Sequence, residues 1–143
     1  MAFHGTFEQS LDAKKRLTVP SKFRSALAGQ VFLVKTEGCL SLYPGDTYAQ
    51  ITRMALEGIN PLSAQARELK RLFHARATDT ELDGAGRLTL SSDLLGHAGI
   101  DREVVIAGAG DCLELWDRSA WEAYDRALSQ RAPDLTAALG HPA

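Results

Sequence analysis

The sequence predicts a β-rich α+β fold in which two tandem copies of one small unit form a single pseudo-symmetric barrel with peripheral helices. Three observations lead to this prediction: an internal repeat, short strand-like runs separated by turn residues, and the small size of each copy. A unit of roughly 45 ordered residues buries too little apolar surface to stand alone, whereas two units can complete one core. The composition, 45% apolar and 24% charged over 143 residues, is that of an ordinary globular protein.

The internal repeat joins two pairs of segments. SLDAKKRLTVPSKF at 10–23 matches ELDGAGRLTLSSDL at 81–94, 71 residues further on. VFLVKTEGCLSLYPGDTY at 31–48 matches VVIAGAGDCLELWDRSAW at 104–121, 73 residues further on. Two matches in the same order indicate a duplicated unit. We therefore divide the chain into a first unit at 1–50, linking helices at 51–76, a second unit at 77–125 and a frayed tail at 133–143.

Each unit is expected to run strand, tight turn, strand, short helix, two strands and a closing helix. The first strands are expected at 5–11 and 75–82, and the turns at 12–16 and 83–87. The short helices begin at Pro20 and Ser91, and the paired strands follow at 31–35 with 39–43 and at 104–107 with 112–116. Asp46 and Ser119 are the expected caps of the closing helices, and a helix at about 63–76 links the units.

The cysteine count and the termini bound the class of protein. Two cysteines, Cys39 and Cys112, are too few for a disulfide framework or a structural zinc site. We expect buried free thiols, with a disulfide as the less favoured alternative. No stretch reaches the run of about 20 apolar residues that spans a bilayer, and the N-terminus lacks the pattern of a signal peptide. We therefore expect a cytoplasmic protein that does not bind membranes.

No pattern in the sequence predicts an enzyme, a cofactor or a metal site. The four histidines lie far apart and have no metal-ligand spacing, and neither cysteine has a neighbouring histidine. No Gly-x-Ser-x-Gly nucleophile motif is present. We therefore expect a binding protein.

A net charge of −2 hides an asymmetry that leaves a nucleic-acid partner open, although charge alone favours a solvated charged surface. Residues 1–78 carry 11 Lys/Arg and 6 Asp/Glu, whereas residues 79–143 carry 5 and 12. Residues 14–24 hold five cations and no acid, which suits phosphate contacts, although a solvated charged surface is the alternative. The expected DNA-binding residues are Lys14, Lys15, Arg16, Lys22, Arg24 and Arg87. Asp12 and Asp83 are expected mainly to pair with Arg16 and Arg87 across their turns.

Four blocks of this sequence resemble the MraZ family of the AbrB-like swapped-hairpin superfamily. The blocks are FEQSLDAKKRLTVPSKFR at 7–24, GCLSLYP at 38–44, ELDGAGRLTLS at 81–91 and GAGDCLELWDRSAWEAY at 108–124. Two departures stand out: Lys15 replaces the family's glycine, and Ser91 replaces its proline. Lys15 must therefore either change the shape of the first turn or adopt a strained left-handed conformation.

The resemblance implies both a fold and a function. Members of the MraZ family fold as two swapped-hairpin units and assemble into homo-oligomeric rings. They bind direct repeats in double-stranded DNA upstream of the operon for cell division and cell-wall synthesis, where they usually repress, including their own gene. We therefore expect a nucleoid-associated, sequence-specific transcriptional repressor. The alternative is a protein-interaction or antitoxin-like module of the same fold, although such antitoxins usually carry one unit and a disordered tail.

Three aromatic residues near the end of the second unit allow two interpretations. Trp116, Trp121 and Tyr124 either contribute to a subunit interface or, as aromatic residues at helical spacing more often do, to the core. A ring would present the basic turn several times, and repeated contacts raise affinity by about 10²–10⁴-fold.

Overall fold

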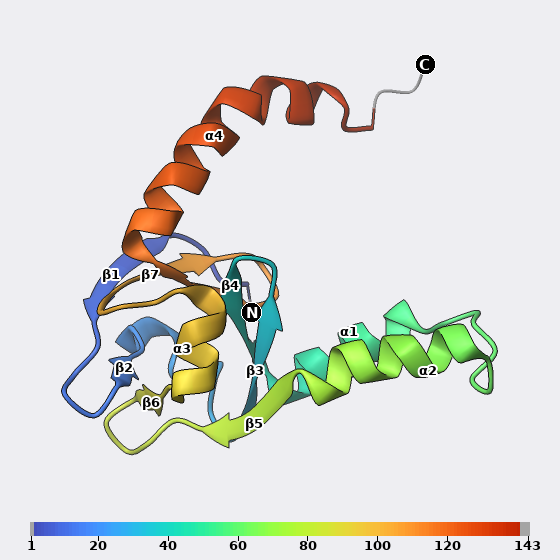
Figure 1. Ribbon diagram of the computed structural model, residues 1–143, viewed down its shortest axis with the longest axis horizontal. Coiled ribbons are helices and arrows are strands. Elements are labelled where there is room, and N and C mark those ends of the chain that lie inside the picture. Colours follow the sequence, from blue (N-terminus) through green and yellow to red (C-terminus); the bar gives the residue numbers. More distant parts are fainter. Residues whose placement is uncertain (1, 141–143) are drawn as a thin grey trace.

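The computed structural model describes residues 2–140 and contains an antiparallel sheet, a short two-stranded ribbon and two helical arms (Figure 1). The strands are β1 (Thr6–Ser10), β2 (Arg16–Thr18), β3 (Gln30–Thr36), β4 (Cys39–Pro44), β5 (Ala77–Glu81), β6 (Arg87–Thr89), β7 (Glu103–Gly108) and β8 (Leu113–Asp117). The helical elements are a 3-10 turn η1 (Ser21–Phe23), α1 (Gly45–Ala55), α2 (Ala64–Lys70), a π-helical turn η2 (Arg71–Ala75), α3 (Ser92–Ala98) and α4 (Arg118–Ala137).

The sheet interleaves the two halves of the chain. Six strands follow the order β1-β7-β8-β4-β3-β5, and β2 pairs with β6 in the separate ribbon. This order reads the same in reverse when each strand is exchanged for its counterpart in the other half, so the molecule has an internal pseudo-two-fold axis at the β4–β8 pair. The first half's β1 pairs with β7 of the second half, and the second half's β5 pairs with β3 of the first.

The predicted closed barrel is wrong, because the sheet is open. Among the described residues, β1 and β5 stand at opposite edges and do not pair with each other. Pro20, which has no backbone N–H to donate, ends the ribbon strand β2 shortly after Thr18, and Ser91 ends β6 by capping α3. The ribbon strands are therefore too short to connect the two edges by hydrogen bonds.

One apolar core lies between the ribbon and the sheet. Leu17 and Leu88, the central residues of β2 and β6, are fully buried in it together with Leu33, Leu40 and Ile106 of the sheet. A smaller cluster on the other face of the sheet holds Cys39, Val105, Ala107 and Trp116, covered by Trp121 of α4. The ribbon thus closes the core by packing where a barrel would close it by strand pairing.

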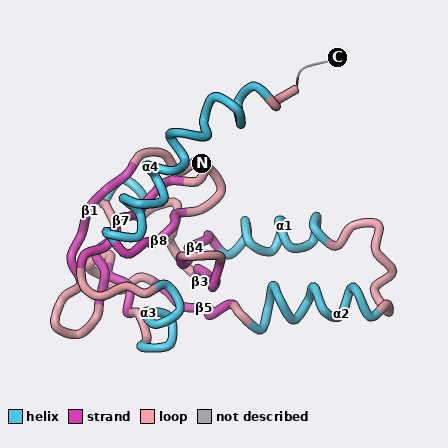
Figure 2. Tube along the Cα trace, turned by 45° about the horizontal axis from the view of Figure 1, so that its top comes forward, coloured by secondary structure: helices cyan, strands magenta, loops and turns pink. Residues whose placement is uncertain are grey.

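Two helical arms project from the sheet in different directions, as both views show (Figures 1 and 2). One arm is the antiparallel pair α1 and α2, which is continuous with β4 at one end and with β5, through η2, at the other. The other arm is α4. No helix within residues 2–140 has the length and apolar character required to cross a membrane.

The paired short helices differ because the second half has two extra residues between its repeat blocks. The predicted helix after Pro20 is only the 3-10 turn η1, whereas its counterpart α3 is a full α-helix capped by the Ser91 hydroxyl, as predicted. The longer connection in the second half gives α3 room for the additional turn before β7 begins.

The ends of the closing helices also differ from the predictions. Asp117, and not Ser119, caps α4 by accepting the Ala120 N–H at 3.3 Å. Asp46 lies inside the first turn of α1, whose cap position is Pro44. The expected boundaries at residues 50 and 125 both fall inside these helices.

The predicted frayed tail is partly helical. The helix α4 continues through Pro133 to Ala137, because an exposed helix can tolerate the one N–H bond that proline removes where water can solvate the freed carbonyl. Residues 141–143 of the expected tail lie outside the described residues.

Candidate nucleic-acid interface

The ribbon turns one face to the core and the other outward. Its register pairs Leu17 with Leu88 at the centre, flanked by Arg16 opposite Thr89 and Thr18 opposite Arg87. Since side chains alternate along a strand, the buried leucines place their neighbours on the outer face. These outward residues are Arg16, Thr18, Arg87 and Thr89.

The first turn is built around the carboxylate of Asp12. One oxygen, Oδ1, accepts the backbone N–H groups of Lys14 and Arg16, both at 2.9 Å. The other, Oδ2, accepts the Arg16 Nε–H at 2.7 Å. These donors, above all the Arg16 backbone N–H, hold the pKa of Asp12 below its ordinary value. The turn is thus fixed by an ionised aspartate.

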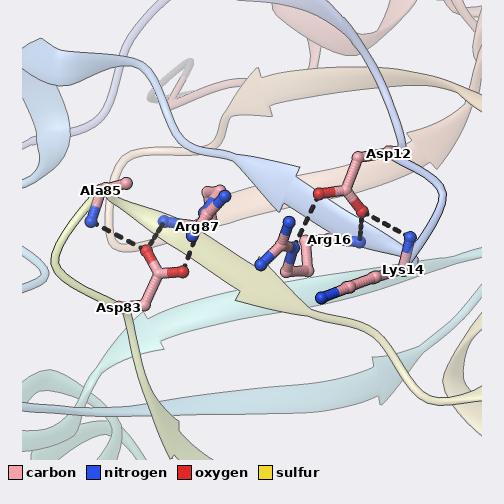
Figure 3. A network of polar contacts seen from close by, with 6 residues as sticks. All are labelled: Asp12, Lys14, Arg16, Asp83, Ala85 and Arg87. Carbon is pink, nitrogen blue, oxygen red and sulfur yellow. Dashed lines mark hydrogen bonds and ion pairs between the residues drawn. The ribbon is translucent and has the colours of Figure 1, made fainter.

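The second turn repeats this arrangement at the opposite end of the ribbon (Figure 3). Asp83 accepts the N–H groups of Ala85 and Arg87 at 2.9 Å and the Arg87 Nε–H at 2.8 Å. The same backbone bonding, chiefly from Arg87, lowers the pKa of Asp83. Figure 3 shows the two arginines lying on the ribbon between the two aspartates. The predicted pairing of each aspartate with its arginine is confirmed.

Each aspartate engages only part of its arginine. The contact uses Nε, and within residues 2–140 the Nη groups of Arg16 and Arg87 donate no hydrogen bond. The side chains are 26% and 34% exposed. The forked ends of both guanidinium groups can therefore bind an acceptor outside the chain, while the aspartates limit their rotation.

Lys15 adopts the left-handed conformation that glycine normally supplies. Its φ is 60°, close to the 75° of Gly86 at the equivalent place in the second turn. The first turn therefore keeps the shape of the second, and of the two alternatives the strained one is correct. The side chain that replaces glycine's hydrogen is exposed and adds a positive charge.

The structure divides the remaining predicted residues among three places. Lys14 is exposed at the first turn. Lys22 lies over the rings of Phe7 and Phe23, 5.0 and 5.1 Å from their centroids, and is held there by cation–π contact. Arg24 lies against the second turn, and its Nε donates to the Val19 carbonyl at 3.2 Å. Arg16 is thus grouped with Lys14 and Lys15, and Arg87 with Arg24.

Sequence reasoning missed Arg102. Together with Asp12 and Lys15 it lines a hollow of about 420 Å³ beside the first turn. It reaches this place because β1 and β7 pair, and the ladder continues with the Leu11 N–H bonded to the Arg102 carbonyl at 2.9 Å. In the sequence Arg102 stands between two acidic residues, so no local cluster of positive charge indicated that it would lie beside the basic turn. The outward threonines were also missed, although the alternation in Arg-Leu-Thr predicts them.

Both cysteines are buried free thiols, as predicted. Burial raises the pKa of Cys39 and of Cys112 to about 11. Among the predicted interface aromatics, Trp116 is buried and stacks on Tyr124 at 4.9 Å between ring centroids, which confirms its core role, whereas Tyr124 stays exposed. In the described part of the chain, no three His, Cys, Asp or Glu side chains cluster as metal ligands.

Comparison with known proteins places this chain in a family. The model of the family described as "MraZ protein, putative antitoxin-like" matches twice, at residues 2–72 and 73–139, in agreement with the internal repeat. Similar proteins include one from Kocuria rhizophila, 40% identical over 85% of each chain. Others are from Mycolicibacterium smegmatis, 37% identical over 87% of each, and Nitrosomonas europaea, 36% identical over 93% of each. All three are named "Transcriptional regulator MraZ". The chain therefore belongs to the MraZ family.

Proposed function

We propose that this protein is a sequence-specific DNA-binding transcriptional regulator that reads DNA with the outer face of the β2–β6 ribbon. The observation that carries the proposal is the pair of arginines on that face, each fixed through Nε by an aspartate and each with Nη groups that donate no hydrogen bond within residues 2–140. A two-stranded ribbon fits the major groove, and arginine can donate two parallel bonds to guanine. Lys14 and Lys15 would hold the flanking phosphates.

The proposed target is a set of direct repeats upstream of the protein's own operon for cell division and cell-wall synthesis, where binding represses transcription. The names of the relatives support a regulator of transcription, and the family resemblance supports this target. The protein would then act in the cytoplasm, on the nucleoid.

A homo-oligomeric ring is the proposed assembly, and the helical arms are the surfaces that support it. Within residues 2–140, every large apolar side chain that is strongly exposed lies on an arm or at its end, and Leu62 reaches 80%. These residues are Met54, Leu62, Leu72, Tyr124, Leu135 and Leu139. Contact between different arms of neighbouring copies would be heterologous, the type that closes rings, and it leaves the ribbon free.

We further propose that the interleaving of the halves is the swapped-hairpin arrangement. Each half would be one such unit, because β1 and β5 each complete the other half's part of the sheet. The division into units at 1–50 and 77–125 joined by helices at 51–76 stays a prediction.

A protein-interaction or antitoxin-like module is the second candidate. The description of the family model, which includes the words "antitoxin-like", favours it. In that case the exposed apolar arms would bind a different protein, and the ribbon would not discriminate between DNA sequences.

Fluorescence anisotropy of labelled DNA tests the proposal. DNA from upstream of this protein's own gene is compared with shuffled DNA at about 0.15 M salt, where the Debye length is near 8 Å. Arg16→Ala removes the first arginine of the ribbon. Arg76→Ala, at an exposed position directly before β5, removes the same charge outside both the ribbon and the helices of the arms and is the matched control.

The unmodified protein and Arg76→Ala should prefer the upstream DNA, and Arg16→Ala should bind it about 5- to 150-fold more weakly, since a bidentate guanine contact contributes about 1–3 kcal/mol. Equal, negligible binding of both DNAs by a folded oligomer would exclude the DNA-binding proposal and favour the interaction module.

A further inference from the structure

The two turns that precede the ribbon strands differ in the charge of their own residues. Residues 12–16 carry three cations and one acid, whereas residues 83–87 carry one cation and one acid. The strand before the second turn adds two exposed acids, Asp79 and Glu81. Taken alone, the second turn would attract phosphate weakly or not at all.

Arg24, from the first half of the chain, lies against this second turn. It lines a hollow of about 200 Å³ together with Asp83, Gly84 and Gly86. A Cβ placed on Gly86 would come within 2.2 Å of the Arg24 Nε, so the arginine occupies the space next to the glycine. The Nε is tied to the Val19 carbonyl, and Val19 in turn donates its N–H to the Gly86 carbonyl at 2.9 Å.

The charge of Arg24 is not neutralised within the described chain. Among residues 2–140 it forms no ion pair with a carboxylate, and its Nη groups donate no hydrogen bond. Arg24 is also partly exposed. It therefore presents a positive charge beside the second turn that an external anion can reach.

The two halves carry a cation beside the turn at different positions of the repeat. Lys15 corresponds to Gly86, and Arg24 corresponds to Leu95, each 71 residues apart. At the first turn the cation is on the turn and the neighbouring position is a buried leucine. At the second turn the turn residue is glycine and the neighbouring position carries the cation. Within this pair of equivalent positions, each turn therefore has one cation, supplied by a different residue.

We infer that Arg24 is the phosphate-binding cation of the second turn, so that each chain holds DNA at both ends of its ribbon. The inference rests on the proposed DNA-binding function. From Lys15 to Val19, the residue paired with Gly86, the ribbon advances four residues, or about 14 Å at 3.4 Å per residue. This span is close to the roughly 12 Å width of the major groove, so the two turns reach phosphates on its two sides.

The salt dependence of DNA binding tests this role. The slope of log K against log salt falls in magnitude by about 0.9 for each phosphate that the protein no longer neutralises. Arg24→Gln removes the charge and keeps a polar side chain, and Arg76→Gln, directly before β5, is the matched control. Folding is checked by circular dichroism, and Arg24→Met, which keeps the packing of the alkyl stem, replaces Arg24→Gln if that variant unfolds.

A double variant moves the charge in place of removing it. Arg24→Leu with Gly86→Lys copies the arrangement of the first turn onto the second, and the shorter leucine side chain would leave the space that the lysine stem needs. We expect Arg24→Gln to lower the magnitude of the slope by about 0.9 for each bound chain. The double variant should recover the original slope, and Arg76→Gln should keep it.

Two results would overturn the inference. One is an unchanged slope in Arg24→Gln, even with weaker binding at every salt concentration, because that pattern indicates a purely structural role. The other is a double variant whose slope stays as low as that of Arg24→Gln. Failure of the proposed function is a different result: the unmodified protein would not prefer the upstream DNA at all.

Discussion

Asp12 and Asp83 each serve two purposes with one carboxylate. One oxygen satisfies two backbone N–H groups of the turn, and the other holds the arginine Nε. Tying down an arginine before it meets its ligand removes rotamer freedom that would otherwise be lost on binding. The aspartates thus link the stability of the turns to the orientation of the two arginines.

Asp12→Asn should destabilise the fold at neutral pH, because the amide cannot match an ionised carboxylate as acceptor for the Arg16 Nε–H. The pKa of Asp12 in the folded chain is below its ordinary value of 3.8. Its stabilising effect is therefore complete above that pH and is lost as the pH falls through the lower, folded pKa. Thermal unfolding should show a gap in Tm between the two proteins at neutral pH that closes in acid. A gap that persists in strong acid would contradict this role.

Individual residues differ in how far the sequence could predict their position. The Asp–Arg pairs follow from four-residue spacing within a turn and are local. Arg24 was predicted as a DNA contact from charge alone, and its place at the second turn depends on β2 pairing with β6. Arg102 depends on β1 pairing with β7. Positions that arise from pairing between the halves are not visible in a local pattern.

One of the two glycines in the second turn meets two constraints at once. Gly86 combines a φ of 75° with the close approach of Arg24, whereas Gly84, two residues earlier, has neither constraint. A side chain at position 86 must take a left-handed backbone and also displace an arginine that is bonded to Val19.

Gly86→Ala should therefore lower the free energy of unfolding by about 1–3 kcal/mol, from left-handed strain and steric displacement. Gly84→Ala is the matched control in the same turn and should change it by less than about 0.5 kcal/mol. Urea denaturation measures both. Equal effects of the two substitutions would show that the packing of Arg24 on Gly86 does not constrain the turn.

The strands were easier to predict than the helix ends. Alternating apolar residues bounded by Gly38 or Gly110 located β3, β4, β7 and β8 to within about two residues. The caps of α1 and α4 were misplaced because the strands before them lead directly into the helices, so that the cap is the last residue of the strand. The 3-10 turn η1 differs from α3 because the second half has two more residues in this connection. The repeat offsets of 71 and 73 residues show this difference, whereas helix propensities do not.

At the scale of the whole molecule, the sequence showed the duplication but did not show whether the sheet closes into a barrel. The repeat predicts two equivalent units sharing a core, and the strand order shows a pseudo-two-fold arrangement. Whether the sheet closes depends on where β2 and β6 end relative to the edge strands. Pro20 and Ser91 mark these ends, but the place of the edge strands depends on pairing between the halves, which no sequence period specifies.

Because the halves are interleaved, neither should fold alone as a monomer. Residues 1–72 without the rest lack β7, the partner of β1, and lack Leu88, the partner of Leu17 in the core. The isolated fragment should be unfolded, or should self-associate so that a second copy supplies the missing strands. An equimolar mixture with residues 73–143 should regain the strand signal in circular dichroism, and analytical ultracentrifugation gives the mass of each species. A folded monomer of residues 1–72 would contradict the interleaved sheet, since its edge strand would have no partner and its core would be open to water.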